Sequence, residues 1–139
     1  MAGAPRDLLD LAEGPSAPFP AGTLLDWAAL ARALQMAGAL DRVLQLTVDH
    51  VTTRVQFGRP LAKFQAIQHM VADIAAEAAL ARAATEAALN VAITSDWTSA
   101  NLGFLVGVAR SCAGHAASVV VRNAHQAHGA MGTTVEHRL

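Results

Sequence analysis

The sequence predicts an all-α fold, an antiparallel up-down helical bundle of three long helices plus the start of a fourth. Apolar residues recur at spacings of three and four in three stretches, turn-forming residues separate the stretches, and no stretch alternates polar and apolar residues long enough to indicate a strand. Hydrophobic residues make up 53% of the chain and charged residues 15%, so a disordered chain is excluded. A bundle of three helices cannot bury that much apolar surface by itself, so we expect a large partner interface or further domains.

Residues 1–22 are expected to be a linker or the remnant of a preceding domain, because prolines and glycines recur throughout them. The bundle is expected over residues 23–139. Thr23 is placed to cap a first helix over residues 23–53. Its apolar stripe follows the helical period and consists of Leu30, Leu34, Ala37, Leu40, Leu44, Val48 and Val51.

A corner at residues 57–60 leads into a second helix over residues 61–93, where the apolar spacing alternates between three and four. Ser95 or Asp96 is expected to cap a third helix over residues 97–127. The seam of the second helix consists of Phe64, Ile67, Val71, Ile74, Ala78 and Ala81. The face of the third consists of Leu102, Leu105, Ala109, Cys112, Ala116 and Val120.

Gly129 and Gly132 are expected to end the third helix. Thr133 or Thr134 then caps the start of a fourth helix over residues 135–139.

The composition argues against several classes of protein. The net charge of −1, with no basic block and no tyrosine, gives no support for nucleic-acid binding. Cys112 lies within a helical pattern and fits a small buried thiol in a reducing compartment. We see no signal peptide and no uninterrupted apolar run of about 18 residues, so we expect a cytoplasmic protein without a membrane span.

Two segments carry the functional signal. Residues 54–73 read Arg-Val-Gln-Phe-Gly-Arg-Pro-Leu-Ala-Lys-Phe-Gln-Ala-Ile-Gln-His-Met-Val-Ala-Asp and place arginine, glutamine and phenylalanine together at the corner between two helices. Residues 125–136 read His-Gln-Ala-His-Gly-Ala-Met-Gly-Thr-Thr-Val-Glu. Their small residues allow the backbone to approach a flat or charged group closely, and Gln126 offers a donor and an acceptor beside it.

In this order and at this distance, the two segments resemble the acyl-CoA dehydrogenase family, flavoproteins that desaturate acyl-CoA thioesters. The family pattern is Arg-x-Gln-Phe-Gly…Phe-Gln…Gln…Ala-Asp followed by Gln-x-x-Gly-Gly-x-Gly-(aromatic)-x-x-Glu, and the resemblance covers residues 24–139. It implies a truncated C-terminal helical domain that contacts flavin adenine dinucleotide (FAD) and forms a homo-oligomer, a dimer or tetramer. For the complete enzyme it implies an acyl-CoA substrate and an electron-transferring flavoprotein as electron acceptor.

The resemblance also implies individual contacts. Arg54 matches the position that faces the pyrophosphate of a neighbouring subunit's FAD, a role that suits a planar guanidinium group. Gln56 and Phe57 match family positions that line the cofactor beside this arginine. The family positions that line the adenosine part of FAD correspond to Leu61, Phe64, Gln65 and Ile67. The family positions that contact the adenine dinucleotide from the facing subunit correspond to Gln126, Ala127, His128, Gly129 and Ala130.

Simpler roles stay open for several of these residues. Core packing alone explains Phe64 and Ile67, because both lie on the seam of the second helix. Arg54 could cap the carbonyl groups at the end of its own helix. Gln65 and Gln68 could be solvated surface side chains.

The resemblance implies a carboxylate base that removes the α-proton of the thioester, and we nominate no catalytic residue. One family position for it lies beyond Leu139, and another falls at Ala29; Asp26, roughly one turn away, is a weak substitute. Glu136 matches a structural glutamate of the family instead. Two further departures are Ala130, in place of the second glycine, and Thr133, in place of the aromatic residue. We therefore expect the isolated chain to be inactive or nearly so.

Two other readings compete with flavin contact. The chain could be a non-catalytic assembly module or a hetero-oligomer subunit that pairs with a full-length relative. The spacing of His125 and His128, with His115 or His137, also suggests a metal site. No carboxylate or thiolate lies at a supporting spacing, so hydrogen-bonded or solvated histidines and no metal are expected.

Overall fold

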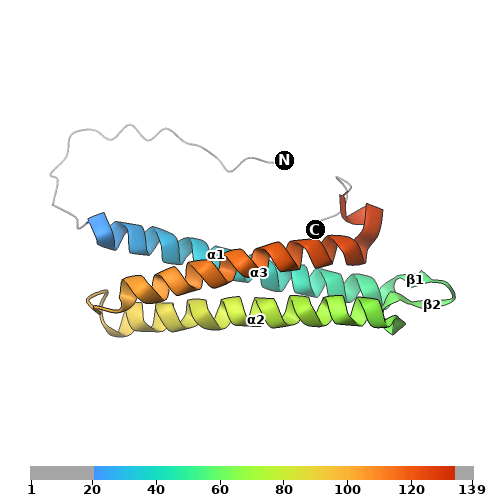
Figure 1. Ribbon diagram of the computed structural model, residues 1–139, viewed down its shortest axis with the longest axis horizontal. Helices are drawn as coiled ribbons and strands as arrows, with labels where there is room; N and C mark the ends of the chain where they lie inside the picture. Colours follow the sequence, from blue (N-terminus) through green and yellow to red (C-terminus); the bar gives the residue numbers. More distant parts are fainter. Residues whose placement is uncertain (1–20, 134–139) are drawn as a thin grey trace.

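The computed structural model describes residues 21–133, which form three long helices lying side by side in alternating directions (Figure 1). They are α1 (Ala21–Thr53), α2 (Gln65–Thr94) and α3 (Leu102–His128). A short 3-10 helix, η1 (Leu61–Lys63), precedes α2, and a second, η2 (Gly129–Thr133), follows α3. The predicted all-α bundle is confirmed. The expected fourth helix and most of the expected linker lie outside the described residues.

Helix α1 begins at Ala21, so the expected start at Thr23 is wrong by two residues. Ala21 and Gly22 belong to the helix and not to the linker, and Thr23 lies inside the first turn. The physical reason is the proline at position 20, because a helix can begin as soon as the chain has passed a proline.

Helix α3 begins at Leu102, five residues later than expected. Asp96 and Trp97 both have left-handed backbones, with φ of 46° and 63°, and these interrupt any continuous helix through them. The hydroxyl of Ser95 accepts a hydrogen bond from the Ser99 amide at 3.3 Å, so it closes the turn and does not cap α3. The N-cap of α3 is Asn101, without a side-chain cap bond.

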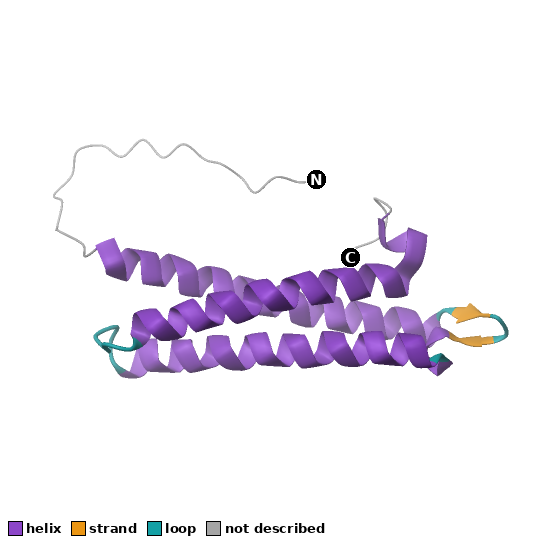
Figure 2. Cartoon of the chain, viewed as in Figure 1, coloured by secondary structure: helices purple, strands orange, loops and turns teal. Residues whose placement is uncertain are grey.

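A small hairpin joins α1 to η1, a detail that the sequence pattern did not predict (Figure 2). Strand β1 (Val55–Gln56) pairs antiparallel with β2 (Arg59–Pro60), with Val55 opposite Pro60. Phe57 and Gly58 between them have φ of 53° and 77°, the positive values of a tight two-residue hairpin turn. Because β2 ends at Pro60 and η1 follows it, α2 begins at Gln65 and not at residue 61.

The core is built mainly from alanine, which lets the three helices pack closely. One cluster lies toward the hairpin end and consists of Leu40, Ile74, Ala78, Ala81, Ala113, Ala116, Val120 and Ala124. The other lies toward the α2–α3 turn and consists of Leu30, Ala33, Ala88, Ala92, Leu102, Val106 and Ala109. Thr47 and Thr85 are also buried, and each donates its hydroxyl hydrogen bond to its own helix. Most residues of the predicted stripes face the core, but Leu34 and Val48 are exposed. Four others are only half-buried and belong to neither cluster: Phe64, Ile67, Val71 and Cys112, so the expected buried thiol is wrong.

Helix α3 is long and apolar enough, by length and composition alone, to cross a membrane. Its buried residues pack against α1 and α2, and a core helix of a bundle has the same composition. Large apolar side chains remain exposed on all three helices, among them Leu25 of α1, Ile93 of α2 and Phe104 of α3. The described bundle therefore presents apolar surface that its own helices do not cover.

Candidate functional site

A cavity of about 370 Å³ lies where the ends of α1 and α3 meet the hairpin, η1 and the start of α2. It brings together the two segments singled out in the sequence, although about seventy residues separate Arg54 from Gln126. Its lining consists of His50, Arg54, Gln56, Leu61, Ile67, Gln126, Ala127, His128, Gly129 and Ala130.

Arg54 stands where α1 ends and the hairpin begins. Its backbone amide donates to the His50 carbonyl at 2.9 Å, and its own carbonyl accepts from the Leu61 amide at 2.9 Å. These two bonds fix the backbone between α1 and η1. The exposed guanidinium group forms no hydrogen bond or ion pair with another described residue, so the alternative role as a cap of its own helix has no support. The side chain is placed to bind an anion from outside.

Three of the predicted contact residues lie outside this cavity. Phe57 is 90% exposed at the hairpin tip and meets Phe64 edge to face, with ring centroids 6.2 Å apart. The guanidinium carbon of Arg59 lies 4.1 Å from the centroid of the Phe64 ring, a cation–π contact. Gln65 is exposed as the first residue of α2. The three form a separate outer surface beside the cavity, and their contact with a cofactor stays a prediction.

The end of α3 shapes the opposite wall of the cavity. Gly129 has φ 63° and ψ −149°, a backbone conformation that only glycine adopts readily, and its amide donates to the His125 carbonyl. This turn directs the backbone of Gly129 and Ala130 into the cavity wall. His128 is buried, and its Nδ1 lies 2.8 Å from the Ala124 carbonyl oxygen. Since a carbonyl only accepts, Nδ1 is the protonated donor.

His50 is a cavity residue that the sequence analysis missed. Its ring stacks on that of His128, with centroids 4.3 Å apart and planes 25° apart. His50 lies in the last turn of α1, four residues before Arg54, and its carbonyl accepts the hydrogen bond of the Arg54 amide. That spacing is the signal that could have identified it.

The charge of the lining favours an anionic ligand. Arg54, His50 and His128 are its basic groups, and none of the lining residues is an aspartate or glutamate. No group of three or more metal-binding side chains occurs within residues 21–133. His125 also places Nδ1 2.8 Å from a backbone carbonyl, that of Val121, so it is a hydrogen-bonded histidine.

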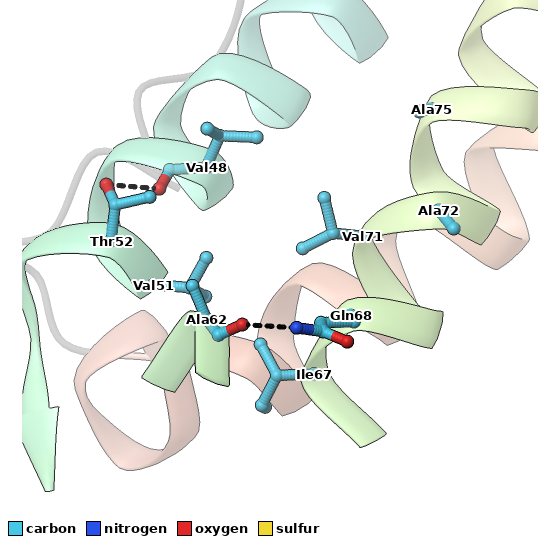
Figure 3. Close-up of a pocket in the computed structure, with 9 residues that line it drawn as sticks. All are labelled: Val48, Val51, Thr52, Ala62, Ile67, Gln68, Val71, Ala72 and Ala75. Carbon is cyan, nitrogen blue, oxygen red and sulfur yellow. Dashed lines mark hydrogen bonds between the residues drawn. The ribbon is translucent and has the colours of Figure 1, made fainter. Parts of the chain in front are cut away.

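A second hollow, of about 310 Å³, is almost entirely apolar and lies between the end of α1 and the start of α2 (Figure 3). Gln68 crosses one end of it and donates its side-chain amide to the Ala62 carbonyl at 2.8 Å. Two further hollows continue along the α1–α2 face and meet at the ion pair between Asp41 and Arg82. We call these three hollows the α1–α2 groove. Of the predicted contact residues it includes Ile67 alone.

Asp26, the weak candidate for a base, lies near the start of α1. A side chain built on Gly103 would meet its carboxylate at 3.7 Å, which places Asp26 beside the start of α3. The rise of an α-helix separates it from Arg54 by roughly 40 Å. Ala29 packs against the core. No aspartate or glutamate is among the described residues that line the cavity, so the lining offers no candidate for the carboxylate base.

Comparison with known proteins identifies the family. The family model for the acyl-CoA dehydrogenase C-terminal domain matches residues 21–139. Acyl-CoA dehydrogenase IpdE2 of Mycolicibacterium smegmatis is 37% identical over 96% of this chain and 42% of its own length. The IpdE2 of Mycobacterium tuberculosis is 37% identical over 82% of this chain and 33% of its own length.

A solved structure with the same architecture is a variant of the Tcur3481-Tcur3483 steroid ACAD. It aligns with a TM-score of 0.77 and 31% identity, over 84% of this chain and 31% of its own. The chain thus spans less than half the length of these relatives. From the motifs, the fold and these matches together, the chain belongs to the acyl-CoA dehydrogenase family, in the region of its C-terminal helical domain.

Proposed function

We propose that this chain is the flavin-contacting and oligomer-forming domain of an FAD-dependent acyl-CoA dehydrogenase. The observation that carries the proposal is the cavity, in which two segments far apart in sequence bring together a glycine-shaped backbone wall and an arginine that pairs with no other described side chain. A dinucleotide has a doubly charged pyrophosphate and flat ring systems. A basic side chain and a close backbone approach suit these two parts.

Arg54 would bind the pyrophosphate of FAD through its planar fork of donors, with Gln56 beside it. Gln126, Gly129 and Ala130 would contact the adenine dinucleotide where small residues leave room. Arg54 is exposed, so a cofactor held mainly by another subunit could reach it. FAD, when bound, would accept a hydride; the residues of this chain would bind and orient it.

The complete enzyme would convert an acyl-CoA to a 2,3-enoyl-CoA and pass electrons to an electron-transferring flavoprotein. Among the described residues, no carboxylate lines the cavity, and the position that some family members use for the base is Ala29. We therefore expect the chain alone not to turn over acyl-CoA. The base would come from a further segment or from a partner subunit.

Exposed apolar surface supports a role in assembly. The α1–α2 groove and exposed side chains such as Phe104 and Ile93 provide area for contacts between subunits. A homo-oligomer, dimer or tetramer, is the first expectation. Pairing with a different full-length relative is the second expectation. The name of the solved relative, which joins the designations Tcur3481 and Tcur3483, supports it.

Equilibrium titration of the purified chain with FAD tests the flavin proposal. Arg54→Ala should weaken binding by about ten- to a hundredfold, because a hydrogen bond to a charged group contributes about 1.5–3 kcal/mol. Arg42→Ala is the matched control, since Arg42 is likewise an exposed arginine but lies within α1, near Gln45 and outside the cavity lining. Equal effects of the two substitutions, or an oligomer that binds no FAD, would leave only the assembly role.

A further inference from the structure

The surface beside the cavity carries a basic residue that the family pattern does not include. We propose that Arg59 stacks on the adenine ring of FAD and so selects the dinucleotide over flavin mononucleotide (FMN). This inference rests on the proposed function. It adds a specificity-determining residue that lies outside the cavity lining.

The hairpin places Arg59 next to the cavity. In the β1–β2 pair Arg59 lies directly opposite Gln56, and directly opposite residues extend their side chains from the same face of a strand pair. Gln56 lines the cavity. Arg59 therefore extends from the face of the hairpin that borders the cavity, and a ligand that reaches beyond Gln56 would meet it.

Phe64 holds the Arg59 side chain in place. The guanidinium carbon lies 4.1 Å from the centroid of the Phe64 ring, and the group forms no hydrogen bond or ion pair with another described residue. Phe64 is itself fixed between η1 and α2, because its amide donates to the Leu61 carbonyl and its carbonyl accepts from the Gln68 amide, each at 3.0 Å. Arg59 is exposed, so the guanidinium group remains accessible to a ligand.

A surface of this composition binds flat rings. Phe57 is 90% exposed and meets Phe64 edge to face, with ring planes 77° apart. Aromatic rings and the planar guanidinium group are the side chains on which nucleotide bases stack, because every base has a π-face. Phe57, Arg59 and Phe64 thus provide a stacking surface for a base.

The size of the cavity requires part of the dinucleotide to lie outside it. The cavity has about 370 Å³, near the lower end of the range of about 300–1,000 Å³ for pockets that hold drug-sized ligands, and FAD is larger than such a ligand. With the pyrophosphate at Arg54, one ring system must extend over the hairpin. The isoalloxazine has to meet the substrate and the carboxylate base, and no carboxylate is among the described residues of the lining. Adenine is accordingly the ring expected at Arg59.

Equilibrium titration of the purified chain with FAD, ADP and FMN tests the inference. The parent chain should bind FAD and ADP more tightly than FMN, which lacks adenine. Arg59→Ala should weaken the binding of FAD and ADP by about three- to tenfold, as expected for one lost stacking contact at an exposed site, and should leave FMN binding unchanged. Arg59→Lys should recover little of the affinity, because lysine keeps the charge but not the planar group.

Lys63→Ala is the matched control. Lys63 is another exposed basic residue of the hairpin end, in η1, and has the charge of Arg59 without its planar group. Its substitution should leave FAD binding nearly unchanged. Circular dichroism of each variant checks that the bundle is intact.

The outcomes separate the two proposals. FAD binding that needs Arg54 but is unchanged in Arg59→Ala would overturn the stacking inference and keep the flavin site. Full affinity in Arg59→Lys, or an equal loss in Lys63→Ala, would show that only charge acts at this surface and would also overturn it. FMN binding as tight as that of FAD would do the same. An absence of FAD binding by the parent chain would overturn both proposals.

Discussion

The two ends of the bundle differ in chemistry, although the same three helices build both. The hairpin end gathers Arg54 and two histidines around a cavity, and a glycine shapes its wall. At the other end, Trp27 packs on Trp97 with ring centroids 5.0 Å apart, and apolar side chains such as Phe104 are exposed nearby. We infer that one end binds a ligand, while the other end provides packing and contact surface.

Left-handed backbones occur at both ends but are occupied differently. Among the described residues of the hairpin end, Gly58 and Gly129 adopt this conformation without steric cost, and Phe57 adopts it at the hairpin tip. At the other end Asp96 and Trp97 occupy left-handed conformations as non-glycine residues. Such residues cost about 1–2 kcal/mol each. The tilted contact between the two tryptophan rings and the hydrogen bonds of the turn oppose that cost.

Gly129→Val should have the largest effect. At φ 63° and ψ −149° a β-branched residue is strained, and we expect a loss of about 1–3 kcal/mol in the free energy of unfolding together with a distorted cavity. Chemical denaturation and FAD titration measure the two effects. Gly107→Ala, in the middle of α3 with no atom within 4 Å of an added Cβ, should instead stabilise the chain by about 0.5–1 kcal/mol. A harmless Gly129→Val would show that the turn after α3 is not constrained.

Phe104→Ser tests whether the apolar end forms a contact surface. The side chain is 73% exposed, so its loss should change the stability of the bundle by less than about 0.5 kcal/mol. If Phe104 lies in an interface, subunit association should weaken by about tenfold, as expected for a buried aromatic contact. Sedimentation equilibrium measures it. Unchanged association would place the interface elsewhere, with the α1–α2 groove as the next surface to test.

Asp96→Gly should act in the opposite direction to Gly129→Val. Glycine adopts φ 46° without the steric cost that aspartate bears, so we expect a gain of about 0.5–1 kcal/mol in stability. Thermal unfolding of the variant beside the parent chain measures the gain. A loss of stability would mean that the aspartate side chain contributes more to the turn than its strained backbone costs.

Arg82→Gln should have the smallest effect. The hydrogen bond and the negative charge of Asp41 raise the pKa of Arg82, but the arginine is exposed to solvent and the pair is screened. Because the folded pKa is raised, the contribution of the pair is complete below the ordinary arginine pKa and is lost only as pH rises through the folded value. We therefore expect a small loss that is constant between pH 6 and pH 9, measured by denaturation. A large loss would make this ion pair a structural anchor of the α1–α2 groove.

The sequence predicted the helices well because their apolar spacing is long and regular. By family resemblance it also assigned Arg54 and Gln126 to contacts with FAD, and in the structure both residues line one cavity. Whether they bind FAD there is the proposal to be tested.

What escaped prediction shares a physical cause. The hairpin strands have two residues each, too few for a pattern of alternation. The left-handed backbones of Asp96 and Trp97 leave no trace in hydrophobic spacing, so α3 was expected to begin too early. His50 belongs to no motif and reaches the cavity only through the packing of α1 against α3.

The most direct test of the central claim is to map FAD binding on the amide resonances of the ¹⁵N-labelled chain by NMR. We predict that FAD shifts the resonances of residues 54–56 and 126–130 and leaves those of the turn at residues 95–101 unchanged. Arg54→Ala should abolish these shifts at the same FAD concentration. Shifts confined to the α1–α2 groove or to the tryptophan end, or shifts that persist in Arg54→Ala, would contradict the assignment of the cavity as the flavin site.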